Sequence, residues 1–416
     1  MAIFKPFRAL RPIPEKAAAI ASMPYDVMDS DEARAEVKKN PLSYLHVEKP
    51  EIDLPLGTDL YAPEVYAKAR ENLLRYVNEG LMKQDSRPMF YIYRQTMDGR
   101  DQIGLVGLAS VDEYMNGIIK KHELTRADKE ADRIRHMDTC DAHPSPVFFT
   151  YRHQDEIDAT VAKVMRQKDP VYDFVSDDGI GHALWLMDSE EDINAIQAAF
   201  AKLPCLYVAD GHHRTASAAK VGLVRREQNP DYTGEEEFNF FMTVIFPDNQ
   251  LKIFDYNRVV KDLNGLTEDE FLAKVREKFS VEPVSQAEPF RPSKLHEFGM
   301  YLGGTWYKLE ALPGTWDDTN VVDSLDVSIM QNNLLHPILG IGDPRRDNRI
   351  DFVGGIRGLG ELVRRVDSGR EAVAFAMFPT SMDELLGIAD AGEIMPPKST
   401  WFEPKLRSGL FIHPLQ

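Results

Sequence analysis

Short apolar runs and amphipathic segments alternate through the middle of the chain. Residues 89–93 and 103–111 are apolar runs of strand length, and the Asp98-Gly99 pair between them is a hairpin turn signal. In residues 62–78, apolar side chains recur on one face of a helix, and Gly80 follows the segment. Strands and helices are mixed without strict alternation, which predicts an α+β (mixed α/β) fold.

A buried strand, a tight turn and a helix are expected in succession over residues 205–227. The apolar run 205–209 predicts the strand, residues 210–214 the turn, and residues 215–227 the helix. The same periodicities predict the neighbouring elements. We expect strands within residues 147–151, 171–187 and 239–246, and helices within residues 155–167, 189–201 and 267–279.

The pattern of prolines and apolar residues changes twice along the chain, which predicts three parts in the protein. Residues 1–88 form an N-terminal segment of proline-rich loops and one amphipathic helix. Residues 89–257 form the mixed central domain, and residues 258–416 form a C-terminal α+β unit with a Pro-Pro-Lys-Ser-Thr tail. The length of 416 residues agrees with two or three units, since domains commonly contain about 100–200 residues.

Charge and composition argue against several classes of protein. The chain has 49 Lys and Arg residues against 67 Asp and Glu residues, and its formal charge of −18 argues against nucleic acid as the main ligand. No apolar stretch is long enough to span a membrane, and Lys5, Arg8 and Arg11 interrupt the first segment. We therefore expect a cytoplasmic protein without membrane contact. Cys140 and Cys205 are too few for a disulfide framework or a structural zinc site.

The strongest candidate site is the turn after the predicted buried strand. Asp210, Gly211, His212, His213 and Arg214 come there in succession, and a helix follows at once. Backbone N–H groups at a helix start, the helix dipole and an adjacent guanidinium all favour an anion, with phosphate as the first candidate. The alternative is a turn in which Asp210 caps the helix and the histidines pack locally.

A second cluster of charged residues lies upstream of this turn. It contains Lys120, Lys121 and Arg126 around the adjacent pair His122 and Glu123. Glu123 is a candidate general base, because a carboxylate must be held close to the hydroxyl that it deprotonates, and the cations would hold negative charge beside it. The alternative is a solvated helix face on which opposite charges pair at helical spacing.

The third cluster lies in the proline-rich tail. Lys398, Ser399, Thr400 and Lys405 occur there close to Trp401. Prolines stiffen the segment, and a disordered tail is poor in aromatic residues. A rigid loop that presents cations to a phosphate is one interpretation. A clamp that ties the C-terminus to the body of the protein is the other.

Together these motifs resemble a large bacterial and archaeal family that is catalogued as a domain of unknown function. The Asp-Gly-His-His-Arg segment is in addition similar to that of the SerK group of free-serine kinases, within the ParB/sulfiredoxin-like superfamily. The segments that carry the resemblance are residues 6–12, 24–27, 40–47, 50–55, 120–133, 210–214, 352–355 and 396–406.

The resemblance implies a ParB/sulfiredoxin-like central domain and a kinase site. Nucleotide phosphates would bind at Gly211 and Arg214, with ATP or ADP as donor and Mg²⁺ on the phosphate oxygens. Glu123, Asp210, His212 and His213 would be the catalytic residues. The expected function is a nucleotide-dependent kinase for a small hydroxyl metabolite, with free L-serine as the best single candidate. A ParB-like nucleotide switch or nuclease, and a non-catalytic metabolite sensor, are the alternatives, and a homo-oligomer stays open.

Overall fold

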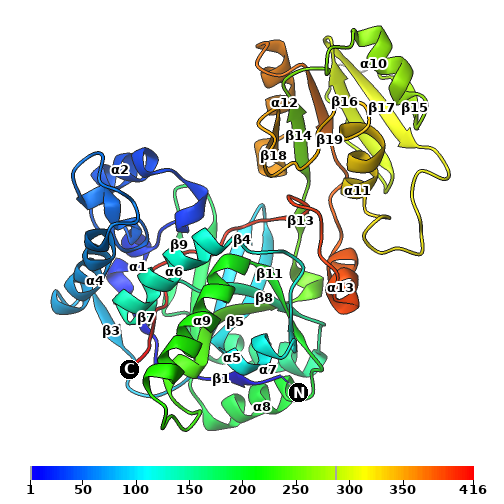
Figure 1. Cartoon of the computed structure of the whole chain (residues 1–416). Coiled ribbons are helices and arrows are strands. Elements are labelled where there is room, and N and C mark those ends of the chain that lie inside the picture. The colour runs from blue at the N-terminus through cyan, green and yellow to red at the C-terminus, as the bar shows by residue number, and fades with distance from the viewer. Residues whose placement is uncertain (1, 286–287) are drawn as a thin grey trace. The chain divides into compact units, whose positions relative to one another are not determined.

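The computed structural model describes residues 2–285 and 288–416, and this part of the chain forms two compact units (Figure 1). Unit 1 comprises the residues up to Leu251 together with Pro404–Gln416, and unit 2 comprises Lys252–Glu403. Both units combine helices with sheets whose strands run largely antiparallel, so the predicted α+β class is confirmed.

A nine-stranded mixed sheet forms the centre of unit 1. Its strands follow the order β6-β11-β8-β12-β5-β4-β10-β9, and β1 pairs with β5. The pairs β6–β11 and β8–β12 are parallel, and the other pairs are antiparallel. The strands are β1 (Phe4–Lys5), β4 (Phe90–Met97), β5 (Arg100–Ser110), β6 (Ile119–Lys120), β8 (Val147–Tyr151), β9 (Tyr172–Val175), β10 (Gly181–Met187), β11 (Leu206–Asp210) and β12 (Phe240–Pro247).

Amphipathic helices cover this sheet and close its core. In Figure 1, α6 and α9 lie side by side in unit 1, and both bury apolar side chains such as Met137 and Val221. The helices are α1 (Ala17–Ile20), α2 (Ser30–Lys39), α3 (Leu45–Glu48), α4 (Pro63–Asn78), α5 (Val111–Met115), α6 (Ala127–Cys140), α7 (Asp155–Gln167), α8 (Glu190–Phe200) and α9 (His212–Gln228). The hairpin and helices expected from the periodicity are present within a few residues of the predicted bounds.

The structure divides the chain differently from the three predicted parts. The first 88 residues do not stand apart, because β1 pairs with β5, and β2 (Leu10–Pro12) pairs with β3 (Met82–Gln84) in the same unit. The last residues also return to unit 1, where β21 (His413–Pro414) pairs with β7 (Ala142–His143). These contacts join residues that are far apart in sequence, which a local pattern does not encode.

Unit 2 is built on a six-stranded sheet with the order β15-β17-β16-β19-β14-β18. Helices pack against it around buried residues such as Val259 and Leu362. The helix expected over residues 267–279 is shorter and ends before strand β15. The elements are β13 (Ile253–Phe254), β14 (Tyr256–Val260), α10 (Glu268–Val275), β15 (Phe279–Pro283), β16 (Glu297–Leu302), β17 (Thr305–Ala311), α11 (Asp326–Met330), β18 (Ile350–Gly354), α12 (Gly360–Asp367), β19 (Val373–Ala376), α13 (Met382–Ala391) and β20 (Trp401–Phe402).

Candidate functional site

Two neighbouring parallel strands bring the first two sequence clusters to one edge of the unit 1 sheet. β6 and β11 pair with Ile119 opposite Leu206 and Lys120 opposite Tyr207. Because both strands run in the same direction, the residues that follow β6 meet the residues that follow β11. The carboxyl ends of parallel strands are where α/β proteins commonly bind ligands. The sequence alone did not predict this pairing.

The turn after β11 is a single glycine. Gly211 has φ of 82°, in the left-handed region, and helix α9 begins directly after it at His212. The helix was expected to begin at Thr215, so His212, His213 and Arg214 belong to its first turn instead of preceding it. The first N–H groups of a helix have no partner within the helix, so this turn presents donors to an anion.

Arg214 is the buried cation of this turn. Its side chain donates from Nη1 to the Pro146 carbonyl at 2.8 Å and lies 3.9 Å from the Asp26 carboxylate, while its residue exposure is 6%. Burial opposes the charge, but Asp26 and Asp210 outweigh burial and raise the pKa of the guanidinium. Among the described residues, Nε of Arg214 has no hydrogen-bond partner. A buried donor of this kind is suited to a phosphate oxygen.

Lys405 brings a second cation to the turn from the C-terminal tail. Its Nζ lies 2.9 Å from the Asp210 carboxylate, and the Gln95 side chain fixes the Lys405 carbonyl at 2.9 Å. Burial acts to raise the pKa of the Asp210 carboxyl, but Lys405 and Arg214 outweigh it and hold that pKa well below its usual range. Asp210 is therefore ionised at neutral pH and positions Lys405 beside Gly211.

Two histidines and a glutamate lie close together next to the turn at Gly211. His122 and His212 lie edge to face with ring centroids 4.4 Å apart, and they are 0% and 4% exposed. Burial lowers the pKa of His122 to about 3 and that of His212 to about 4, so both rings are neutral at pH 7. The Glu123 carboxylate lies 3.5 Å from Nδ1 of His212 and is partly exposed. The predicted role of this carboxylate as a general base stays a prediction.

The other three residues of the second cluster each make a different kind of contact. The Lys120 ammonium lies 5.9 Å from the Tyr207 ring, and the Lys121 ammonium lies 4.5 Å from the Tyr114 ring. Arg126 contacts the site through its backbone, whose N–H donates to Nε2 of His213 at 3.1 Å. Its guanidinium pairs with Asp128 at 2.7 Å instead. The predicted phosphate role of these three side chains stays a prediction.

The predicted tail site is divided between the two units. Lys405 belongs to unit 1, whereas Lys398, Ser399 and Thr400 belong to unit 2. In unit 2 the Lys398 ammonium lies 5.5 Å from the Tyr256 ring, and the Ser399 hydroxyl donates to the Pro396 carbonyl at 2.6 Å. The roles of these three residues at a phosphate remain predictions. Residues 404–416 belong to unit 1, where His413 and Pro414 pair with strand β7. The choice between a phosphate loop and a clamp stays open.

Sequence reasoning missed several charged residues that border Arg214. Asp26 faces its guanidinium, and the adjacent Tyr25 ring lies 4.2 Å from the Arg133 guanidinium. Glu48 is 2% exposed; burial raises the pKa of its carboxyl, against the attraction of Arg133 and Arg214. The Pro-Tyr-Asp-Val segment at residues 24–27 was an available signal for Asp26, since it is one of the segments that carry the family resemblance.

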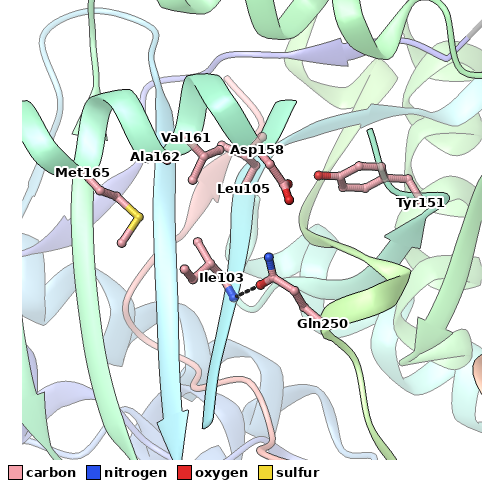
Figure 2. Close-up of a pocket in the computed structure, with 8 residues that line it drawn as sticks. All are labelled: Ile103, Leu105, Tyr151, Asp158, Val161, Ala162, Met165 and Gln250. Carbon is pink, nitrogen blue, oxygen red and sulfur yellow. Dashed lines mark hydrogen bonds between the residues drawn. The ribbon is translucent and has the colours of Figure 1, made fainter. Parts of the chain in front are cut away.

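A separate cavity of about 170 Å³ lies between helix α7 and strand β5 of unit 1 (Figure 2). The Ile103 N–H donates to Oε1 of Gln250 at 2.8 Å, and Figure 2 draws this hydrogen bond as a dashed line. None of the sequence-predicted site residues lines this cavity. Its lining residues are Ile103, Leu105, Tyr151, Asp158, Val161, Ala162, Met165 and Gln250.

No helix in the described ranges combines the length and apolar composition that a membrane crossing requires. A search of curated protein sequences gave no match.

Solved structures with a partly similar arrangement of elements have low sequence identity to the chain. A free serine kinase in complex with AMP matches with a TM-score of 0.36 at 12% identity, over 73% of this chain and 90% of that one. SbnI with C-terminal truncation from Staphylococcus aureus gives a TM-score of 0.40 at 12% identity, over 74% and 87%. A conserved hypothetical protein from Pyrococcus furiosus gives 0.35 at 12% identity, over 74% and 94%.

The family comparison covers most of the chain. The sequence pattern of one family matches residues 4–328. This range includes most of unit 1 and the turn at Gly211. The chain therefore belongs to the family described as "Protein of unknown function (DUF1015)".

Proposed function

We propose that unit 1 binds the phosphates of a nucleotide at the start of helix α9 and transfers a phosphoryl group to a small hydroxyl metabolite. Free L-serine is the first acceptor to test. The observation that carries the proposal is the buried Arg214, whose Nε has no partner in the described structure, beside the open N–H groups that follow Gly211. A buried donor, a helix start and a nearby lysine together match the needs of a phosphate group.

The residues present can meet the chemical needs of phosphoryl transfer. The reaction breaks the bond between the terminal phosphorus and the leaving nucleotide oxygen, and it forms a bond from phosphorus to the acceptor oxygen. Positioning and charge neutralisation supply most of the rate, and Arg214 and Lys405 are placed for both. The proton of the acceptor hydroxyl would pass to Glu123, whose carboxylate is partly exposed beside His212.

The protein groups of this site do not form a magnesium cage. Mg²⁺ prefers oxygen ligands, whereas the carboxylate of Asp210 is paired with Lys405 and the groups nearest Glu123 are imidazoles. Any Mg²⁺ in the reaction would therefore be held mainly by the nucleotide phosphates and water. We assign no step to it.

The test is phosphorylation by the purified full chain. The protein is incubated with ATP or ADP and a mixture of amino acids and other hydroxyl compounds, and mass spectrometry identifies any phosphorylated product. We expect one product, with phosphoserine first among the candidates. Arg214→Lys removes the guanidinium fork and should weaken nucleotide binding by roughly 10- to 100-fold.

Arg225→Lys is the matched control, because Arg225 lies on the same helix but pairs with Asp138 and Asp141. It should leave nucleotide affinity unchanged. Nucleotide binding without any product would support the metabolite sensor instead, and failure to bind any nucleotide would refute the proposal.

A further inference from the structure

His122, Glu123 and His212 together form a donor set for a metal ion. Each side chain offers one ligand atom, and these atoms all lie within 4.8 Å of one another. The set is assembled by the parallel pair β6–β11, since His122 and Glu123 follow β6 and His212 opens the helix after β11. The three residues come from two separate sequence clusters that the fold brings to the same sheet edge.

Buried polar atoms at this place lack partners. Over the described residues, neither ring nitrogen of the fully buried His122 has a hydrogen bond, and Nε2 of His212 has none. The Val208 carbonyl lies near the His122 ring but without the geometry of a hydrogen bond. An unsatisfied buried polar atom destabilises the fold. A cation can take the lone pair of one ring nitrogen of each histidine, so at His122 it would satisfy one of the two unpartnered nitrogens.

We propose that His122, Glu123 and His212 bind a divalent transition-metal ion, with Zn²⁺ as the ion that fits best. Two neutral imidazoles and one carboxylate are the donor types that zinc takes in sites that keep an open position. Mg²⁺ and Ca²⁺ are disfavoured because they prefer oxygen ligands. Glu123 is partly exposed, so solvent or a small molecule can reach the remaining position.

The geometry needs only a small adjustment to hold the ion. Zinc bonds of about 2.0–2.1 Å in a tetrahedron place ligand atoms about 3.3–3.4 Å apart. One pair already matches, since Oε2 of Glu123 lies 3.5 Å from Nδ1 of His212. The other pairs of ligand atoms lie at most 4.8 Å apart, so they must close by up to about 1.4 Å to reach the same separation.

The test measures metal binding to the full chain without nucleotide or acceptor. The protein is stripped with a chelator and dialysed against Zn²⁺, and bound metal is quantified by mass spectrometry. A parallel sample is titrated with Co²⁺, whose visible absorption reports nitrogen and oxygen ligation. We expect one equivalent of Zn²⁺, a cobalt spectrum of low coordination number and a zinc-dependent rise in melting temperature.

Glu123→Gln removes one ligand at a partly exposed position, and it should weaken zinc binding by more than about 100-fold, since even outer-shell changes cost 10- to 100-fold. The melting temperature of the metal-free variant checks that it folds. His212→Asn is the second ligand variant, judged by the same measurements. His153→Ala is the matched control, because His153 pairs with Asp158 at 3.0 Å and belongs to no group of three donors in the part of the chain that the structure describes. It should bind zinc as the unaltered protein does.

Zinc binding that survives both ligand variants, or that His153→Ala abolishes, would overturn the inference. So would a stripped protein that takes up no zinc. None of these readouts uses turnover, so the phosphotransferase proposal and the metal site can fail independently.

Discussion

Replacing Lys405 with Met should destabilise unit 1, because it removes the partner of Asp210. The two charged atoms lie 2.9 Å apart, and the side chains are only 14% and 32% exposed. Exposed ion pairs contribute about 0–1 kcal/mol, whereas breaking a buried pair costs about 3–5 kcal/mol. Asp210 keeps the Gly211 N–H as a partner at 2.7 Å. We therefore expect an intermediate loss, about 2 kcal/mol of unfolding free energy at pH 7.

The loss should depend on pH in a defined direction. The pKa of Asp210 in the folded protein lies below its ordinary value, so the pair stabilises the fold above about pH 4. This stabilisation is lost as the pH falls through the folded-state pKa, because Asp210 is then protonated in the folded protein as well and no longer forms an ion pair with Lys405. The difference between Lys405→Met and the unaltered protein should therefore shrink at pH 3.

Calorimetric melting of the full chain measures the effect. A loss of about 2 kcal/mol lowers a transition of this size by about 4–8 °C. Lys202→Met is the matched control: its ion pair with Glu156 is equally short, at 2.7 Å, but its side chains are 64% and 46% exposed. Equal losses in the two variants, or a Lys405→Met loss that persists at pH 3, would refute the reasoning.

Three further predictions concern single residues of unit 1. Glu123→Gln should lower turnover by about 10²–10⁴-fold and leave nucleotide affinity nearly unchanged. Single-turnover kinetics measures the first quantity and calorimetric titration the second, and normal turnover would place Glu123 outside the reaction. Gly211→Ala should lower the free energy of unfolding by about 1–3 kcal/mol, because the backbone there has φ of 82°. It should also weaken nucleotide binding, because the added Cβ would lie 3.4 Å from the Arg214 side chain. Gly179→Ala, also at φ 82° but with nothing within 4 Å, should change only stability. Burial lowers the pKa of His136 to about 3, so this ring takes up a proton at pH 5 only in the unfolded chain. The free energy of unfolding should therefore be about 2 kcal/mol lower at pH 5 than at pH 7 on account of His136. His136→Gln should remove that part of the pH dependence, measured by urea unfolding.

The sequence predicted the local parts of the site correctly. The apolar run before Asp210 gave the buried strand, and the glycine after it gave the turn, because both follow from local periodicity and backbone freedom. The start of α9 was placed three residues late at Thr215. Polar residues such as His212 and His213 were assigned to a loop, although the first turn of a helix accepts them readily.

Long-range contacts explain most of what the sequence did not predict. Lys405 and Asp210 are 195 positions apart, and no pattern in the sequence specifies a contact over such a separation. The two-residue strand β6 is too short to show a periodicity, so its pairing with β11 was not predictable. That pairing is what brings His122 to His212. A metal donor set split between two such strands has no spacing motif in the sequence.

Glu123 now has two proposed roles, and a variant of His122 separates them. If the carboxylate acts only as a general base, His122→Asn should turn over nearly normally, because in the described structure no ring nitrogen of His122 has a hydrogen bond that could orient Glu123. If instead the metal site takes part in activating the acceptor, the ligands act as one unit and their losses do not add. We expect the second result: His122→Asn should lower turnover as far as Glu123→Gln does, and the double variant should be no slower than either. The melting temperature of each metal-free variant controls for unfolding. Normal turnover in His122→Asn, with zinc binding lost, would assign the proton transfer to Glu123 alone and place the metal outside the reaction.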